Sequence, residues 1–350
     1  MRMIIKKTLL IFAVLPLLLV QTAMAESPVA LKAVGTWSSL TNFKKHEGPF
    51  FNDVLAKASN GQIIGDIKSM SGLGLKGFEI MRLVKNGVFD FAFGLPGYVA
   101  AENAVFEGAD LSSVTQDIET QRKVTDAYFP TMEKAFEEIY NAKLLMLYPF
   151  PSQTLWCNAE VNGLSDLKGK KIRVYATSLG DFVEGAGGTS VTVSFGEVIP
   201  ALEKGVVDCG ITGTMSAYSA NWHQVATHAY TLRVGWGIAF GAMNLDKWNS
   251  MSANQQATMK TEIAALNDRM WAETATEDKV AISCITGGAC NIGEPGSMKL
   301  VEPSKQDLAA RDKIADDVVL ARWAERCGVD CAENWNKTVG IILNKKAIAK

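Results

Sequence analysis

The sequence has little of what characterises nucleic-acid-binding or metal-binding proteins. Its 35 lysine and arginine residues are balanced by 37 aspartate and glutamate residues, so the net charge of the 350-residue chain is -2. A protein that binds phosphate backbones carries a basic excess, so nucleic acid is not expected as a partner. The chain has three histidines, His46, His223 and His228, and it contains no Cys-x-x-Cys motif. We therefore expect neither a metal site nor another cofactor.

Long hydrophobic runs are absent beyond the first 25 residues. Those residues combine basic side chains at Arg2, Lys6 and Lys7, an apolar stretch over 8–20 and the small-x-small sequence Ala23-Met24-Ala25. This pattern is typical of a signal peptide, residues 1–25, that is cleaved after Ala25. The apolar stretch is shorter than the roughly 20 residues that cross a bilayer, so we expect a soluble, exported protein. The residue directly after the predicted cleavage site is Glu26 and not a cysteine, which argues against a lipid anchor.

Six cysteines in an exported chain favour disulfide bonds. Cys284 and Cys290 are close in sequence, as are Cys327 and Cys331, whereas Cys157 and Cys209 are 52 positions apart. Six cysteines allow 15 pairings, so the spacing alone leaves the connectivity open. The two local pairs and a pair between Cys157 and Cys209 are the candidates.

Strands alternate with helices along the chain, which predicts the α/β class with largely parallel sheets. Hydrophobic periodicity predicts strands over 29–34, 62–70, 88–94, 143–148, 171–175, 189–193 and 206–211. It predicts helices over 50–58, 78–85, 120–141, 307–326 and 335–350. Residues 253–283 carry few helix-breaking residues and predict one long helix, followed by a glycine-rich loop over 286–297.

The segment Gly72-Leu73-Gly74-Leu75-Lys76-Gly77 matches the glycine pattern of dinucleotide-binding proteins. That fingerprint follows a buried and mainly apolar strand, whereas the residues before this segment include Asp66, Lys68 and Ser69. We therefore expect a glycine-rich turn rather than a cofactor site.

Arg173 lies within a predicted strand, between Ile172 and Val174. An arginine there either points to solvent or holds an anion in a cleft, because its planar guanidinium suits a carboxylate. Glu197 has a structural interpretation, because Ser194 and Glu197 have the spacing of a capping box at a helix start. Several aromatic residues fall at predicted strand ends or loops, where α/β folds bind ligands: Trp37, Tyr98, Trp156, Phe195, Trp222 and Trp236.

Three segments in one block, 166–174, 195–198 and 201–208, resemble the DctP-type solute-binding proteins of tripartite ATP-independent periplasmic (TRAP) transporters. Residues 51–61, 86–90 and 244–248 are similar to further segments of that family, so the resemblance covers most of the chain after residue 25.

The resemblance implies a two-lobed periplasmic-binding-protein fold with hinge-crossing strands and a long connecting helix. Lobe I is then expected to comprise 26–150 plus 238–282, and lobe II 151–237 plus 283–350. It also implies a monomeric periplasmic receptor, not an enzyme, that binds an organic acid between its lobes and delivers it to the membrane permease subunits.

The resemblance places the family's carboxylate-binding arginine on Arg173 and its pocket aromatic on Phe195. Gln153 stands where a second arginine is expected, Thr212 replaces a usual asparagine, and two polar positions fall on Leu95 and Tyr98. These departures make the pocket less charged and favour a compact monocarboxylate, including one with an aromatic or apolar body. The predicted ligand-binding set is Arg173, Phe195, Thr212, Gln153, Tyr98, Trp37, Trp156 and Trp236.

An enzyme of a different class is the alternative. Cys157 or Cys209 could act as a nucleophile with His223 or His228 as its base, which would make the protein an exported thiol hydrolase. No local sequence signature accompanies these residues.

Overall fold

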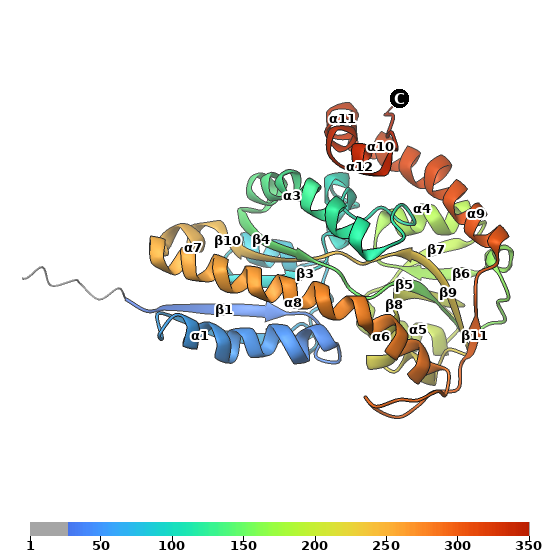
Figure 1. Cartoon of the computed structure of the whole chain (residues 1–350), viewed down its shortest axis with the longest axis horizontal. Helices are drawn as coiled ribbons and strands as arrows, with labels where there is room; N and C mark the ends of the chain where they lie inside the picture. Colours follow the sequence, from blue (N-terminus) through green and yellow to red (C-terminus); the bar gives the residue numbers. More distant parts are fainter. Residues whose placement is uncertain (1–26, 350) are drawn as a thin grey trace, which may run out of the picture.

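The computed structural model describes residues 27–349, which form two mixed sheets with helices packed against them (Figure 1). The first sheet has the order β2-β1-β3-β10-β4 and comprises β1 (Val29–Gly35), β2 (Ile63–Ser69), β3 (Phe91–Gly94), β4 (Ala142–Tyr148) and β10 (Ala239–Asn244). The second has the order β11-β9-β5-β8-β6-β7 and comprises β5 (Gln153–Cys157), β6 (Lys171–Val174), β7 (Thr189–Thr192), β8 (Cys209–Gly213), β9 (His228–Gly235) and β11 (Lys299–Val301). The predicted α/β class is confirmed. The predicted signal peptide and its cleavage site lie outside the described residues.

Two crossing segments join the sheets. The chain leaves the first sheet along β4 and enters the second along β5, and it returns along β9 into β10. The outgoing and returning strands are neighbours in both sheets, so β10 runs antiparallel to β4 and β5 antiparallel to β9. β10 is also antiparallel to β3, and β5 to β8, so the expectation of largely parallel sheets is wrong at the crossing strands.

The α-helices have the following bounds: α1 (Leu55–Ala58), α2 (Ile80–Lys85), α3 (Ile118–Tyr140), α4 (Thr177–Gly185), α5 (Val198–Glu203), α6 (Thr214–Ser219), α7 (Leu245–Ser250), α8 (Ala253–Ile285), α9 (Lys305–Ile314), α10 (Ala321–Cys327), α11 (Val329–Trp335) and α12 (Ile341–Leu343). The last predicted helix is wrong in its bounds, because α11 begins after Gly328 and the helical segment ends before Asn344, both of which have positive φ. Within residues 27–349, no helix combines the length and the apolar character of a membrane span.

The long helix α8 runs beside both sheets (Figure 1) and contacts the crossing segments. A capping box of Ser252 and Gln255 begins it. Within the helix, the Thr274 hydroxyl donates to the Pro149 carbonyl at 3.2 Å, and Asp278 accepts a hydrogen bond from the Ser152 backbone N–H at 3.0 Å. The helix therefore holds the outgoing crossing segment in place.

The C-terminal helices also connect the two parts of the molecule. The indole of Trp323 donates to the Ala104 carbonyl at 2.8 Å, beside the first sheet, whereas Arg326 pairs with Asp181 of α4 at 2.6 Å, beside the second. The strands of each sheet fall within the ranges expected for one lobe. The exact lobe boundaries stay a prediction.

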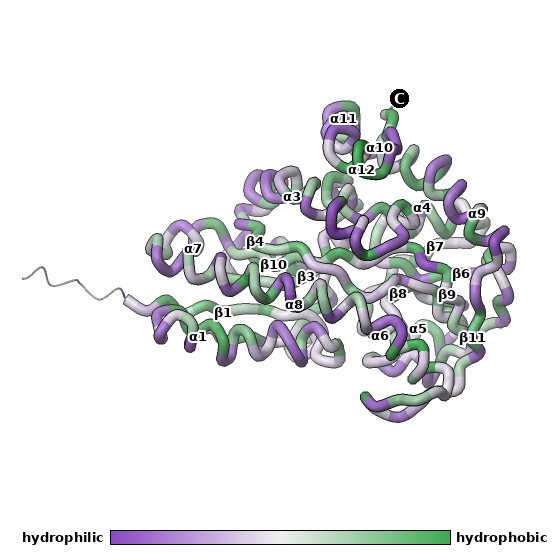
Figure 2. The backbone as a smooth tube through the Cα atoms, viewed as in Figure 1, coloured by the Kyte–Doolittle hydropathy of each residue, from purple (hydrophilic) through white to green (hydrophobic). Residues whose placement is uncertain are grey.

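Hydrophobic residues are frequent along β1 and β4, whereas the turns of α3 and α7 include many hydrophilic residues (Figure 2). β5, β8 and β10 have no exposed residue, as expected for strands that are covered on both faces. Burial of these faces supplies the main favourable contribution to folding.

All six cysteines are paired in disulfide bonds. The bonds join Cys157 to Cys209, Cys284 to Cys290 and Cys327 to Cys331, which are the three candidate pairs. Cys157 and Cys209 lie directly opposite each other in the antiparallel β5–β8 pair, so this bond ties two central strands of the second sheet together.

We predict that removing the Cys157–Cys209 bond costs more stability than removing Cys284–Cys290. The first bond closes a loop of 52 positions and the second a loop of six, and loop-closure entropy gives about 4 and about 2 kcal/mol respectively. Urea unfolding of the double variants Cys157→Ala/Cys209→Ala and Cys284→Ala/Cys290→Ala measures both losses. Equal losses would contradict the prediction.

Glu47 is a fully buried carboxyl next to the end of β1. It accepts hydrogen bonds from the Thr36 backbone N–H at 2.6 Å and from the Tyr148 hydroxyl at 3.0 Å. Burial raises the pKa of Glu47 from 4.5 to about 7, because desolvation outweighs these hydrogen bonds. The folded protein therefore holds this proton more tightly than the unfolded chain does.

We predict that Glu47 makes the fold less stable as the pH rises. Between pH 4.5 and about 7 the unfolded chain releases the Glu47 proton while the folded protein keeps it, so its contribution is largest below pH 4.5 and lost through pH 7. The shift corresponds to roughly 3 kcal/mol. Between pH 4.5 and 8, the unfolding free energy of the wild type should fall by this amount more than that of Glu47→Gln. Parallel curves would contradict the prediction, since other buried carboxyls are unchanged in the variant.

Candidate functional site

Arg173 is the centre of the candidate site. It lies on β6 between β7 and β8, and its side chain is 1% exposed. Its Nε donates to the Val193 carbonyl at 2.8 Å and its Nη1 to the Ile211 carbonyl at 2.7 Å. Its Nη2 is buried and has no hydrogen-bond partner among the described residues, and none of their carboxylates forms an ion pair with it. Burial lowers the pKa of Arg173, which nevertheless stays a strong base.

A small pocket surrounds this guanidinium. Its cavity volume is about 20 Å³, and the space free of atoms is about 290 Å³ when the mouth that opens to solvent is included. Its lining is Trp37, Leu40, Leu95, Tyr98, Phe150, Gln153, Arg173, Tyr175, Phe195, Thr212 and Ser216. These residues come from segments that follow β1, β3, β6 and β7, from the crossing segment, and from β5, β6, β8 and α6, so both sheets contribute. Open α/β folds bind ligands at the carboxyl ends of strands in this way.

Five of the eleven residues that line the pocket are aromatic. The ring centroids of Trp37 and Phe195 are 5.0 Å apart, and those of Trp37 and Tyr98 are 6.0 Å apart. The Arg173 guanidinium carbon lies 5.3 Å from the centroid of the Tyr175 ring and 5.9 Å from that of Trp222. These cation–π contacts stabilise a buried positive charge without neutralising it.

The remaining polar groups of the wall are neutral. The Tyr175 hydroxyl donates to Gln153 Oε1 at 3.3 Å, and Gln153 Nε2 donates to the Pro151 carbonyl at 3.0 Å. Burial raises the pKa of Tyr98 to about 12, although the nearby Arg173 charge acts in the opposite direction. Arg173 is therefore the single charged side chain in the lining.

Six of the eight predicted site residues line this one pocket: Arg173, Phe195, Thr212, Gln153, Tyr98 and Trp37. Trp156 and Trp236 are buried but do not line it. Trp156 donates its indole N–H to the Thr212 carbonyl at 3.0 Å, and Trp236 packs against Arg233, whose guanidinium carbon is 4.6 Å from the indole ring centroid.

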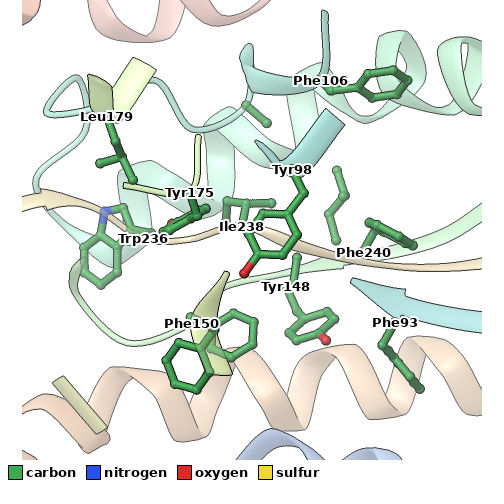
Figure 3. Packing of buried hydrophobic residues seen from close by; sticks show 14 of the residues in the cluster. Phe93, Tyr98, Phe106, Tyr148, Phe150, Tyr175, Leu179, Trp236, Ile238 and Phe240 are labelled. Carbon is green, nitrogen blue, oxygen red and sulfur yellow. The ribbon is translucent and has the colours of Figure 1, made fainter. Parts of the chain in front are cut away.

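Four lining residues were not predicted from the sequence, namely Tyr175, Phe150, Leu40 and Ser216. Tyr175 follows Arg173 by two positions, and side chains two apart on a strand point to the same face. That periodicity is a signal that could have found it. Figure 3 shows Tyr175 and Tyr98 close together among the buried residues, with the Tyr98 hydroxyl on the side where Phe150 lies.

The prediction that Glu197 takes part in a capping box is wrong. The Ser194 hydroxyl donates to the Glu197 carboxylate at 2.5 Å and caps no backbone N–H, so the predicted capping box is not formed. Glu197 instead pairs with Lys76 at 2.6 Å. Lys76 belongs to the glycine-rich segment after β2, so this exposed ion pair joins elements of the two sheets.

The glycine-rich segment is a turn against the pocket wall. Gly77 has a φ of 104°, and a Cβ atom there would lie 2.3 Å from the Tyr98 ring. The absence of a side chain at position 77 therefore lets the Tyr98 ring occupy its place.

The thiol-hydrolase alternative has no support in the structure. Cys157 and Cys209 are bonded to each other, so neither can supply the thiolate that such an enzyme requires. Within residues 27–349, no cluster of three or more His, Cys, Asp and Glu side chains could hold a metal ion.

Several solved structures share this fold. DctP7, an extracytoplasmic solute receptor from Bordetella pertussis that binds pyroglutamic acid, has a TM-score of 0.80 and 18% identity, over 91% of this chain and 100% of that one. A TRAP periplasmic solute-binding protein from Desulfovibrio salexigens with bound orotic acid has a TM-score of 0.80 and 17% identity, over 89% and 99%. One from Shewanella oneidensis with bound succinate has a TM-score of 0.75 and 17% identity, over 88% and 98%. The two-lobed periplasmic-binding-protein fold is thereby confirmed.

The family model described as bacterial extracellular solute-binding protein, family 7 (DctP), matches residues 34–325. The match spans both sheets and the Arg173 pocket. It therefore includes every segment on which the sequence resemblance rests, and it confirms that resemblance. Because it covers most of the chain, the protein belongs to the DctP family of bacterial extracellular solute-binding proteins.

Proposed function

We propose that the protein is the periplasmic receptor of a TRAP transporter and that it binds a compact monocarboxylate between its two lobes. The observation that carries this proposal is the buried Arg173 guanidinium, which has a free Nη2 and no carboxylate partner in the described part of the chain. A buried cation is costly unless it is paired. An anionic ligand is the partner that this site lacks.

The geometry favours a carboxylate as that anion. Two backbone carbonyls hold Nε and Nη1, which fixes the plane of the guanidinium, and the donors on Nη2 remain available. A carboxylate accepts such N–H groups in charge-assisted hydrogen bonds, which are short and strong. Because the lowered dielectric of a closed pocket strengthens the ion pair, closure and binding support each other.

The lining favours one negative charge on the ligand. Gln153 is neutral where a second arginine was expected, and Tyr98 and Tyr175 are un-ionised phenols near neutral pH. A second carboxylate would be buried without a cationic partner, which is unfavourable. The aromatic walls of Trp37 and Phe195 suit a flat or apolar body.

The comparisons support an organic acid as the ligand. The receptors from Bordetella pertussis and Desulfovibrio salexigens bind pyroglutamic acid and orotic acid, each of which has one carboxyl group on a ring. The Shewanella oneidensis protein binds succinate, a dicarboxylate. Our choice of a monocarboxylate therefore rests on the single cation in this pocket.

We propose that the two sides of the pocket close around the ligand during transport. The pocket wall combines Trp37 and Tyr98, which follow strands of the first sheet, with Arg173 and Phe195 from the second. A ligand that contacts both sides binds the closed arrangement more tightly than the open one and shifts the population toward it. The closed receptor, a monomer in this proposal, then delivers the acid to the permease subunits without chemical change.

We predict that Arg173→Lys weakens acid binding by about tenfold to a hundredfold. Lysine keeps the charge but loses the planar set of donors, and hydrogen bonds to charged groups contribute about 1.5–3 kcal/mol. Isothermal titration calorimetry with the acid that binds best measures the change. Arg311→Lys is the matched control, because Arg311 is also buried but pairs with Asp312 on α9, outside the pocket. Unchanged affinity in Arg173→Lys would remove Arg173 from the site.

We predict that monocarboxylates raise the melting temperature of the protein in a concentration-dependent way. A ligand at 100 times its dissociation constant stabilises the folded state by about 2.7 kcal/mol. Thermal-shift measurements with pyroglutamate, benzoate and propanoate, each beside its uncharged amide, test this expectation. Amides that stabilise the protein as much as the acids would contradict the proposed carboxylate contact.

A further inference from the structure

A second space lies beside the Arg173 pocket. It is a groove of about 860 Å³ that is open to solvent. Its lining includes Phe78, Gly97, Ala101, Ala176, Gly180 and Thr192. Two side chains line both the pocket and the groove, namely Tyr98 and Tyr175. These two rings therefore separate the two spaces.

The two rings meet from opposite sides. Tyr98 lies in the turn after β3 of the first sheet, whereas Tyr175 follows β6 of the second. Their centroids are 5.7 Å apart with an interplanar angle of 63°, which is an edge-to-face contact. Both side chains are 8% exposed, so little solvent reaches the contact. We call this pair the tyrosine wall.

The packing around it holds the tyrosine wall in place. The Tyr98 ring stacks on Phe78, with centroids 4.4 Å apart and an interplanar angle of 21°, and Gly77 leaves the space that the ring occupies. The Tyr175 hydroxyl is hydrogen-bonded to Gln153. Neither ring can turn aside without losing these contacts.

The groove beyond the wall suits an uncharged chain. Several of its lining residues have small side chains, namely Gly97, Ala101, Ala176 and Gly180. Its ionisable side chains, Asp181 and Glu184, are acidic and pair with arginines of α10. The lining offers no cation to a second carboxylate, whereas methylene groups would meet small side chains.

We infer that the tyrosine wall sets the maximum length of the acid that the receptor accepts, with Tyr98 as the specificity-determining residue. This inference rests on the proposed function. A carboxylate held by Arg173 has the tyrosine wall on its groove side, so a longer body meets Tyr98. Replacing the Tyr98 ring with a small side chain joins the pocket to the groove.

Calorimetry with propanoate, benzoate, octanoate and decanoate tests the inference on the wild type, Tyr98→Ala and Tyr98→Leu. The readout is the ratio of the dissociation constant of octanoate to that of propanoate, which cancels a general loss of affinity. We expect the wild type to prefer the short acids, and we expect Tyr98→Ala to lower the ratio at least tenfold. Each methylene that enters the groove contributes about a fourfold gain in affinity.

Two controls separate ring size from other effects. Tyr98→Phe keeps the ring and should keep the preference for short acids. Tyr218→Ala removes another buried tyrosine that lines neither space, and it should leave the ratio unchanged. Tyr98→Leu reports on the wall even where Tyr98→Ala fails to fold.

The outcomes distinguish the two proposals. Suppose that the wild type binds propanoate and that a folded Tyr98→Ala or Tyr98→Leu variant has the same octanoate-to-propanoate ratio of dissociation constants. This result would overturn the role of the tyrosine wall but not the proposed function. Equal affinity of the wild type for decanoate and propanoate would also overturn the role of the tyrosine wall and leave the proposed function intact. A wild type that binds neither propanoate nor benzoate overturns the proposed function, and the inference with it.

Discussion

A buried guanidinium without a counter-ion is the constraint on which the rest of the site depends. Backbone carbonyls of two neighbouring segments accept from Arg173 and so define where its remaining donors point. The aromatic rings around it shield the charge from water while leaving it unneutralised. A protein interior tolerates such an arrangement at a cost in folding free energy, and a bound anion offsets that cost. The unpaired charge of Arg173 is therefore the source both of the attraction for an anion and of the cost in folding free energy.

The fold supplies what this constraint requires. β6 carries Arg173 in the second sheet, while the turns after β1 and β3 bring Trp37 and Tyr98 from the first. The crossing strands and α8 connect the sheets at points near the pocket, through contacts such as Thr274 with Pro149. A small relative movement of the two sheets at these connections changes how far Arg173 is shielded.

Much of the fold and part of the site could be predicted from the sequence. The long helix α8 was predictable because 33 residues without strong breakers give one unambiguous signal. The crossing strand β10 was not predicted, because a strand that is buried on both faces lacks the alternation that reveals a strand. β9 was not predicted either, although its buried Leu232 and Val234 alternate with the partly exposed Arg233. Phe195 and Trp156 were both expected at strand ends or loops, but Trp156 lies within β5, and which way a ring points depends on packing between distant segments. That is why one lines the pocket and the other does not.

The contact between Gly77 and Tyr98 limits which residues position 77 can accept. The backbone at Gly77 has a left-handed conformation, and any Cβ there would overlap the tyrosine ring. A descendant of this protein that acquires a side chain at 77 must also replace the aromatic ring at 98. Loss of the ring at position 98 carries no matching requirement at position 77, so the dependence runs in one direction only.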